Sequence, residues 1–418
     1  METPQNWIPT FFRDIGVFYG GGTPSTVNSE YWNGPIQWTT SKRLGDAPYL
    51  DCGERTISDR ALRESSTTLI PAGNLLIGTR VGTGKIVVNR IDIAISQDLT
   101  GVIVDKSKYL PEFVAYQTRA QRLQECFQKQ KRGVTIQGIS RDDLKEFILY
   151  IPPLPEQKKI AALLLNIQKA IEIQESIIEK TRELKKSTLH HVFTHGLRGE
   201  RLKETEVGQI PESWVLSRIS DLVTETTQTN PSKTPERKIK YIDVSSISNT
   251  RYVIETWVNL LGKEAPSRAR KVVKKGDVIV ATVRPTLRRL AFITPDFNNE
   301  ICSTAFCVLR SCPDVLDQRF LFYTIQRNEF FAGLEKLQQG ASYPAVADSD
   351  VKDQWIPLPR IAEQNEIANC FQVIDKKIEL HTAKRAALQD LFKTMLNKLM
   401  TGEIRVKDLD IDVSEVSA

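Results

Sequence analysis

Several features that place a chain in a familiar class are missing from this sequence. It contains no run of about 18 or more apolar residues, and the stretch from Met1 to Trp7 lacks the basic and apolar regions of a signal peptide. Cysteine is sparse, with 6 among 418 residues, which excludes a small secreted fold held together by disulfides. We therefore expect a cytoplasmic protein without a membrane span.

The sequence also lacks the recurrent signatures of catalytic and metal sites. Gly82-Thr83-Gly84-Lys85 resembles a phosphate loop, but Ile86 stands where Ser or Thr is required, so a tight turn between strands is the better interpretation. Cys302, Cys307 and Cys312 form no CxxC pair and have no histidine nearby, which disfavours zinc. Nucleotide fingerprints and nucleophile elbows are missing as well. We expect no catalytic residues, no metal and no cofactor bound by this chain.

Two short segments keep an enzymatic hypothesis open. Asp143-Leu144-Lys145 and Asp350-Val351-Lys352 resemble the Asp-x-Lys piece of metal-dependent nucleases. Their position just inside a predicted helix start favours capping and solvation instead. A self-contained nuclease or methyltransferase would turn over DNA when the purified chain is assayed alone with magnesium and S-adenosylmethionine.

The composition is that of a globular protein. Hydrophobic residues make up 40% and charged residues 26%, and the length predicts two or three globular units. Lys and Arg number 57 against 51 Asp and Glu, a net charge of +6. This excess is mild, but it would suit a polyanion such as DNA if it were gathered on one face.

The chain is an internal duplication with a separation of 207 residues, the distance between Trp7 and Trp214. The same separation relates Pro4 to Pro211, Asp14 to Asp221, Phe113 to Phe320, Tyr116 to Tyr323, Gly133 to Gly340, Glu156-Gln157 to Glu363-Gln364, and Ile160-Ala161 to Ile367-Ala368. The match is strong over about 140–195 and 347–401 and weak over about 20–110 and 227–316. The two copies therefore share a scaffold and differ in content.

Each well-matched stretch has the apolar periodicity of a long helix. Apolar residues recur at spacings of three and four from Glu156 to Phe193, and again from Ile367 to Leu399. Prolines precede both stretches, and Gly196 and Gly402 end them. A helix of this length, about 55 Å, needs a partner for its apolar stripe. We expect the two helices to pack as an antiparallel coiled coil; the alternative is that each packs on its own globular domain.

The globular parts are predicted to be mixed α/β domains. Short apolar runs bounded by Gly, Pro and Asp indicate strands, for example at 75–79, 102–104, 278–282 and 306–309, and one helix is expected in each copy, around 111–128 and 316–337. The predicted fold class is α+β, with two duplicated mixed α/β domains separated by the two long helices. The expected boundaries are 1–150 for the first domain, 151–200 for the central helix, 201–357 for the second domain, and 358–418 for the C-terminal helix and tail.

The junction between the first domain and its helix resembles a known family. Ile151-Pro152-Pro153-Leu154-Pro155-Glu156-Gln157-Lys158-Lys159-Ile160-Ala161 closely resembles the corresponding junction of specificity (S) subunits of type I restriction-modification systems, and Gly208-Gln209-Ile210-Pro211-Glu212-Ser213-Trp214 resembles the opening of their second half. The resemblance covers the whole chain. The second junction, Ile356-Pro357-Leu358-Pro359-Arg360-Ile361-Ala362-Glu363-Gln364, and the segment Thr3-Pro4-Gln5-Asn6-Trp7 depart from the family pattern.

The resemblance implies a non-catalytic DNA-specificity subunit. Each variable domain, a target recognition domain, would read one half of an asymmetric bipartite site, and the helices would set the spacing and dock methyltransferase (M) subunits. Two M subunits are the implied partners, with restriction (R) subunits left open. S-adenosylmethionine, ATP and magnesium would belong to these partners. Base edges in the major groove are read by loop side chains, so two divergent domains on one repeated scaffold suit two different half-sites.

We expect the DNA-facing residues in polar loops of the two domains. In the first domain they are Thr39, Thr40, Ser41, Lys42, Arg43, Thr79, Arg80, Lys129, Lys131, Arg132, Thr135 and Gln137. In the second domain they are Ser245, Ser246, Arg284, Arg288, Arg289, Gln338, Gln339, Ser342 and Tyr343. The expected partner contacts are the repeated pairs Glu156 with Gln157 and Glu363 with Gln364.

Two further hypotheses stay open beside the specificity subunit. One is the specificity subunit of a related two-subunit enzyme that cuts on both sides of its site. The other is a helical adaptor that joins proteins without touching DNA. Selection of random-sequence DNA with the methyltransferase present separates the adaptor from the DNA reader, because an adaptor enriches no bipartite motif.

Overall fold

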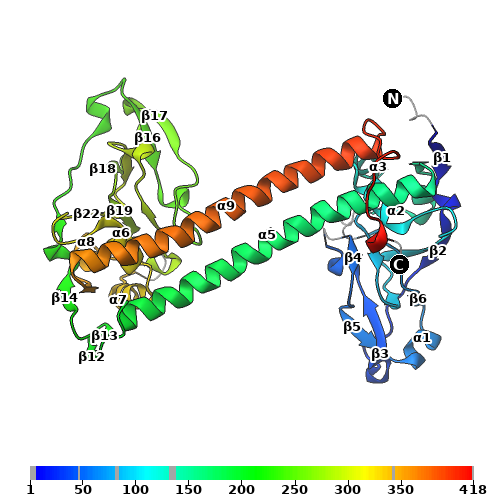
Figure 1. Cartoon of the computed structure of the whole chain (residues 1–418), viewed down its shortest axis with the longest axis horizontal. Coiled ribbons are helices and arrows are strands. Elements are labelled where there is room, and N and C mark those ends of the chain that lie inside the picture. Colours follow the sequence, from blue (N-terminus) through cyan, green and yellow to red (C-terminus); the bar gives the residue numbers. More distant parts are fainter. Residues whose placement is uncertain (1–5, 46–47, 81–83, 131–137, 341–343, 417–418) are drawn as a thin grey trace. The chain divides into compact units, whose positions relative to one another are not determined.

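The computed structural model describes residues 6–45, 48–80, 84–130, 138–340 and 344–416. The chain divides into two compact units: a first unit of Met1–Ser176 with Thr382–Ala418, and a second unit of Ile177–His381. The long helices α5 (Leu154–His195) and α9 (Ile361–Met400) each contribute one half to each unit (Figure 1). Among the described residues, none of the helices is both long and apolar enough to cross a membrane.

The first unit is built on two main sheets. The larger has the order β2 (Gly16–Gly20), β10 (Leu99–Val104), β7 (Asn74–Gly78), β8 (Ile86–Asn89), β4 (Tyr49–Leu50). The smaller has the order β5 (Arg55–Ile57), β3 (Trp32–Thr39), β9 (Ile93–Ile95), β6 (Thr68–Ile70), and β1 (Ile8–Phe11) pairs with β11 (Ile148–Ile151). The helices of this unit, besides its parts of α5 and α9, are α1 (Asp59–Glu64), α2 (Pro111–Arg119), α3 (Gln121–Gln130) and α4 (Arg141–Lys145).

The second unit repeats this plan. One sheet has the order β15 (Val223–Thr224), β22 (Phe306–Ser311), β19 (Val278–Ala281), β20 (Leu290–Phe292), and the other β17 (Val258–Leu261), β16 (Lys238–Ile242), β21 (Ile301–Ser303), β18 (Ala269–Val272). Two further strand pairs are β14 (Val215–Arg218) with β23 (Trp355–Leu358), and β12 (Leu202–Thr205) with β13 (Gly208–Pro211). The short helices are α6 (Gln318–Thr324), α7 (Asn328–Leu337) and α8 (Asp348–Lys352).

Strand registers extend the duplication into the regions where the two sequences barely match. In the first unit β3 runs parallel to β9, with Thr39 opposite Ile95. In the second unit β16 runs parallel to β21, with Ile242 opposite Cys302. The other strands that the two units share pair antiparallel in the same order, whereas β4, which runs parallel to β8 in the first unit, has no counterpart among the described strands of the second unit. The predicted duplicated, mixed α/β fold is therefore confirmed.

The two long helices pack against each other within each unit. In the first unit Leu164 near the start of α5 shares a core with Leu399 near the end of α9. In the second unit Phe193 near the end of α5 shares a core with Phe371 near the start of α9. The start of one helix thus meets the end of the other in both units, which is the predicted antiparallel pairing.

The C-terminal ends of the two long helices are set as the sequence predicts. Gly196 and Gly402 follow the last turns with φ of 66° and 69°, the left-handed conformation that glycine adopts without strain. The N-terminal ends differ from the prediction. Helix α5 starts at Leu154, two residues before Glu156, and α9 starts at Ile361, six residues before Ile367.

The prediction of one continuous helix around 111–128, and of another around 316–337, is wrong. The chain bends at Ala120, which is extended with ψ of 145°, and separates α2 from α3; residues 325–327 separate α6 from α7. All residues from Pro111 to Thr118 are buried, whereas α3 buries only Leu123 and Phe127. The bend therefore carries the chain from a core helix to an amphipathic surface helix, a change that apolar periodicity alone does not reveal.

Candidate nucleic-acid interface

In the first unit, the carboxylate of Asp98 connects loops that lie far apart in the sequence. Strand β3 runs into the 3-10 turn η3 (Ser41–Arg43), and the backbone N–H of Ser41 donates to Asp98 Oδ2 over 3.1 Å. The hydroxyls of Ser41 and Ser96 also donate to this carboxylate. Burial would raise the pKa of Asp98, but these hydrogen bonds outweigh burial, and the pKa lies below its ordinary value. The turn after β3 is therefore held by a charged acceptor.

The backbone of the same residue holds the next predicted loop. Thr79, just after β7, donates from its N–H and its hydroxyl to the carbonyl of Asp98, over 3.0 and 3.2 Å. The carbonyl of Thr79 in turn accepts from the N–H of Ile139, over 2.8 Å. The structure thus brings three predicted segments together: the turn after β3, the end of β7, and the segment that leads into α4.

The second unit repeats the backbone part of this arrangement. Thr282 donates to the carbonyl of Ala305 from its N–H and its hydroxyl, over 2.8 and 3.0 Å, and its own carbonyl accepts from the N–H of Val346 over 2.9 Å. Ala305 carries no carboxylate, so the 3-10 turn η6 (Val244–Ser246) is held differently. The guanidinium of Arg289 donates to the carbonyl of Val244 over 2.5 Å.

The β19–β20 connection of the second unit carries two of the predicted arginines. Arg284 and Arg288 flank the short turn η8 (Pro285–Leu287) and both have positive φ, 48° and 51°. The N–H of Arg284 donates to the carbonyl of Pro344 over 2.7 Å, and Gln339 pairs with Ala345 in the adjoining segment. Arg288 donates to Asn328 and lies over the ring of Phe331. Of the predicted residues of this unit, Arg284 and Gln339 therefore lie in adjoining loops.

Exposure divides the described residues among the predicted DNA-facing set into three groups. Those with exposed side chains are Lys42, Arg43, Arg80, Lys129, Ser245, Arg284 and Gln339. Thr40, Arg288, Arg289 and Gln338 are half-buried, and Thr39, Ser41, Thr79 and Ser246 are buried. Lys131, Arg132, Thr135, Gln137, Ser342 and Tyr343 lie outside the described residues. The first group is basic and polar, which suits contact with phosphates and base edges.

Asp98, Ser96 and Lys85 are residues of the first cluster that the sequence analysis missed. Lys85 donates to the carbonyl of Leu44, directly after η3, over 3.3 Å. Strand registers place Lys85 of the first unit at the position of Arg289 in the second, because each directly precedes the strand paired with β7 or β19. A basic residue at this matched position was the available signal.

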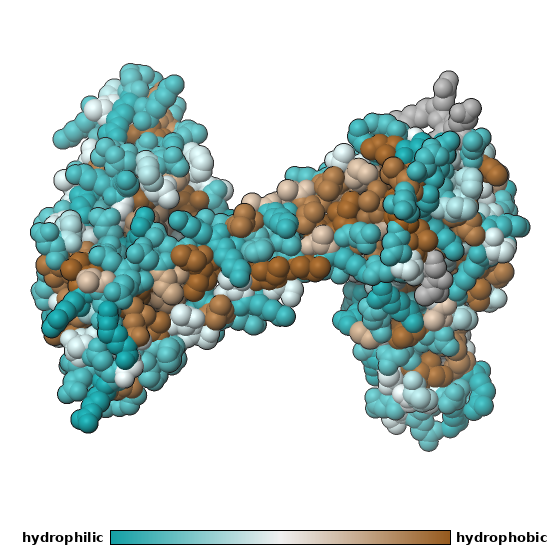
Figure 2. All heavy atoms as spheres, in the orientation of Figure 1, coloured by the Kyte–Doolittle hydropathy of each residue, from teal (hydrophilic) through white to brown (hydrophobic). Residues whose placement is uncertain are grey.

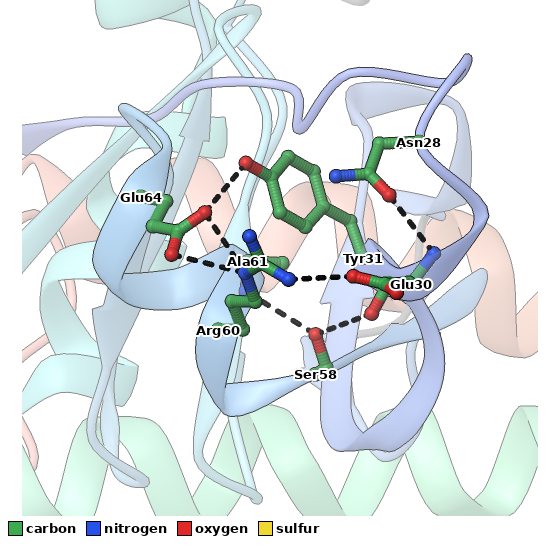
Figure 3. A network of polar contacts seen from close by, with 7 residues as sticks. All are labelled: Asn28, Glu30, Tyr31, Ser58, Arg60, Ala61 and Glu64. Carbon is green, nitrogen blue, oxygen red and sulfur yellow. Dashed lines mark hydrogen bonds and ion pairs between the residues drawn. The ribbon is translucent and has the colours of Figure 1, made fainter.

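A second polar network in the first unit joins one arginine to two glutamates. Figure 3 shows Arg60 on α1 donating to Glu64 and to Glu30, while the hydroxyl of Tyr31 donates to Glu64 over 2.9 Å. Ser58 caps α1 by accepting from the N–H of Ala61. Because two glutamates face one arginine, this network is acidic on balance, so it serves the fold of α1 and not the basic loop cluster.

The repeated Glu-Gln pairs occupy buried positions at the helix starts. Gln157 accepts from the N–H of Leu110 and donates to the carbonyls of Lys108 and Pro152, and Gln364 makes the same three bonds to Asp317, Val315 and Pro359. Both glutamates are also buried. The predicted contact between these four residues and a partner has no direct test, but their polar atoms already serve the chain itself.

Each buried glutamate is paired with an arginine that follows the opposite long helix. In the first unit Arg405 makes a bidentate ion pair with Glu156, over 2.7 and 2.8 Å. In the second unit Arg198 pairs with Glu363 over 3.2 Å. The two arginines are themselves 207 residues apart, the separation of the duplication. These pairs fasten the end of one helix to the start of the other within each unit.

The helices also expose large apolar side chains outside their shared core. Figure 2 shows hydrophobic side chains at the surface along the helical stretch. The large apolar residues that are exposed on the two helices are Ile173 and Leu391 in the first unit, and Leu184, Ile361, Val373 and Leu380 in the second. Exposed apolar residues on a helix are a common feature of protein interfaces.

The two Asp-x-Lys segments lie at helix starts. Asp350 Oδ2 accepts from the N–H of Ala347, the residue before α8, over 2.7 Å. Asp143 lies in the first turn of α4, whose N-cap is Ser140. The capping interpretation is therefore supported for Asp350 by a direct bond and for Asp143 by its position.

Comparison with known proteins gives one consistent family. Residues 4–182 and 211–390 match the family model described as the type I restriction modification DNA specificity domain. Similar proteins from Methanocaldococcus jannaschii are the type I restriction enzyme MjaVIII specificity subunit, 24% identical over 98% of this chain and 96% of its own length, and the MjaIX specificity subunit, 25% identical over 98% and 96%. The crystal structure of a type I restriction-modification S subunit from M. genitalium has a similar fold, with a TM-score of 0.61 at 14% identity, covering 95% of this chain and 99% of that chain.

Proposed function

Because the chain belongs to the family of type I restriction-modification DNA specificity proteins, we propose that it is a non-catalytic subunit whose two units each read one half of an asymmetric bipartite DNA site. The observation that carries this proposal is the pair of loop clusters. Each cluster sits on the same duplicated backbone, with Thr79 or Thr282 at its centre, and each presents different exposed side chains. A common scaffold with different readers is what two different half-sites require.

Phosphate and base contacts divide between these exposed residues. Lys42, Arg43, Arg80 and Arg284 supply cations for phosphates or for guanine edges, and Ser245 and Gln339 supply donors and acceptors for bases. The chain contributes no catalytic group in this proposal. Methylation and cleavage belong to partner subunits, which bring S-adenosylmethionine, ATP and magnesium.

The helices dock two M subunits in this proposal, with or without R subunits. We assign the exposed apolar residues of the helices to these docking surfaces, Ile173 and Leu391 in the first unit, and Leu184, Val373 and Leu380 in the second. Two surfaces built from a duplicated scaffold predict two bound copies of the partner. Native mass spectrometry that gives only a one-to-one complex under saturating conditions would contradict this part.

The complete proposal is tested by mapping methylated sites. The full chain, co-purified with its methyltransferase, is given duplex DNA and S-adenosylmethionine, and the modified bases are located by sequencing. We expect two short half-sites separated by a spacer of fixed length, and no turnover when the chain is assayed alone with magnesium and S-adenosylmethionine. A single contiguous motif, or turnover by the chain alone, would overturn the proposal.

A further inference from the structure

The 3-10 turn η3 of the first unit is held from both sides, although two of its side chains point into solvent. Lys42 and Arg43 are exposed, and Ser41, the first residue of the turn, is buried. On one side Ser41 donates twice to Asp98, as described above. On the other side Thr40, the residue before the turn, donates to Glu54 over 2.6 Å. The backbone that presents the two basic side chains is therefore fixed.

Asp98 is the strongest of these holding groups. Its carboxylate collects three donors, two from Ser41 and one from Ser96, and hydrogen bonds to an ionised acceptor are about twice as strong as neutral ones. It lies just after β9, which is paired with β3, so it reaches the turn from the neighbouring strand of the same sheet. Its backbone carbonyl also anchors Thr79, which precedes the exposed Arg80. Asp98 thus holds two adjoining loops in place, the turn η3 and the loop after β7.

The second unit holds its turn from a different direction. At the position matched to Asp98 stands Ala305. The turn η6 is capped by its own Asp243, which accepts from the N–H of Val244, and is held from the neighbouring sheet by Arg289, which donates to the carbonyl of Val244. The exposed residue of this turn is Ser245 instead of a cation. The two units therefore differ in the group that fixes the turn as well as in the side chains that the turn presents.

We infer that Asp98 and Arg289 are positioning residues for sequence readout, each for the half-site read by its own unit. Neither side chain needs to touch DNA, because each acts through the backbone of the turn that it holds. A side chain that contacts base edges must be placed to within a fraction of an ångström to discriminate between bases. Phosphate contacts carry no sequence information, so a loosened turn should lose sequence specificity before it loses its phosphate contacts. This inference rests on the proposed function and goes beyond it by naming the residues that set the geometry of each reader.

The test uses the full chain in complex with its methyltransferase and a library of random-sequence duplex DNA. Five variants are compared with the unaltered complex: Asp98→Ala, Asp98→Asn, Arg289→Ala and two controls. Asp92→Asn is the control for the first unit, because Asp92 precedes β9 and its carboxylate accepts one backbone N–H, that of Ala72. Arg237→Ala is the control for the second unit, because Arg237 precedes β16 and donates to the carbonyl of Asn299.

We expect Asp98→Ala to lower the enrichment of one half-site about five- to tenfold and to leave the other half unchanged. Asp98→Asn keeps an oxygen that accepts from Ser41, so its effect should be smaller at the same half. Arg289→Ala should lower the enrichment of the opposite half, and both controls should leave both halves unchanged. Thermal unfolding followed by circular dichroism establishes that each variant is folded, and Asp98→Asn serves as the test if Asp98→Ala is not.

A double-mutant cycle separates positioning from a general structural effect. Ser41→Ala removes the hydroxyl that donates to Asp98, so combining it with Asp98→Ala should add little further loss at the same half. Equal loss at both halves, an effect of both variants on the same half, or an unchanged half in Asp98→Ala would overturn the inference. If the unaltered complex enriches no bipartite motif, the proposed function itself fails, which is a different result from an unchanged half.

Discussion

The two units differ at one buried polar position beside the matched strands β7 and β19. In the first unit Asn74 is neutral and uses its amide to accept from the N–H of Val104 and donate to the carbonyl of Pro71. At the matched position of the second unit, Asp277 receives two hydrogen bonds from Arg310, over 2.8 and 2.7 Å. Both copies of the duplicated scaffold therefore have a buried polar side chain at this position. Its hydrogen bonds are made with neutral backbone groups in the first copy and include an ion pair with an arginine in the second.

The largest expected effect follows from removing one member of this ion pair. Arg310→Met leaves Asp277 buried without its partner, which should cost the second unit about 3–5 kcal/mol of stability. Hydrogen exchange of amides in β19 and β22 measures this loss, with β7 and β10 as the internal reference. The control is Arg218→Met, which removes an exposed pair with Asp353 and should cost less than about 1 kcal/mol. An equal loss of protection in both units would contradict the assignment.

Of the two arginine–glutamate pairs at the helix ends, the pair in the first unit should stabilise the protein more than the pair in the second unit. Both glutamates are buried, but the Arg405 side chain is only 24% exposed and makes two bonds to Glu156, whereas the Arg198 side chain is 52% exposed and reaches Glu363 by a 3.2 Å contact. Arg405→Ala should therefore cost about 2 kcal/mol and Arg198→Ala less than about 1 kcal/mol. Urea unfolding of the two variants measures the difference. Equal costs would show that burial does not distinguish the pairs.

Two matched lysines should have similar effects on DNA affinity, unlike the loops that read different half-sites. Lys129 at the end of α3 and Lys336 at the end of α7 are 207 residues apart and both exposed. If they contact phosphates, Lys129→Ala and Lys336→Ala should each weaken binding to all DNA sequences similarly and reduce the salt dependence of log K by about 1. Fluorescence anisotropy at several salt concentrations tests this expectation. A loss confined to one target sequence would reassign the lysine to base readout.

A smaller change in target is expected when the helices are lengthened. Because α5 and α9 pair within both units, four residues should be inserted into each, after Ser176 and after His381, where the two units divide. The insertion adds about 6 Å and roughly 40° of rotation, since each residue contributes about 1.5 Å and 100°. One base pair turns the duplex by roughly 35°, and a major-groove reader tolerates a shift better than a wrong face. We expect a spacer one base pair longer with both half-sites intact; an unchanged spacer in an active complex would refute the helices as a ruler.

The duplication and the helices could be predicted from the sequence because their signals are periodic. Apolar residues at spacings of three and four, the prolines before the helices and Gly196 and Gly402 after them act locally, and the structure keeps them. The sheet order could not be predicted in the same way, because the strands are short and pair with partners far along the chain. The bend at Ala120 was missed because a core helix and a surface helix have similar apolar spacing.

The candidate site was predicted only in part. Loop composition drew attention to Thr39, Ser41 and Thr79, which do lie in one cluster, but Asp98 is 57 residues from Ser41 in sequence and carries no motif. The repeated pair of Glu156 and Gln157 was interpreted as a surface feature, although repetition equally marks a buried structural contact. Arg198 and Arg405 share the separation of the duplication and were the signal for that contact.

The central claim, that two units on one scaffold read separate halves of the target, is tested most directly by changing only the exposed side chains of one turn. The variant Lys42→Ala with Arg43→Ala removes both basic side chains of η3 and leaves Ser41 and Asp98 in place. Sequencing of the sites methylated by the complete complex is the measurement. We predict that one half of the motif changes while the other half and the spacer stay the same. Equal loss of sequence preference at both halves would contradict the claim.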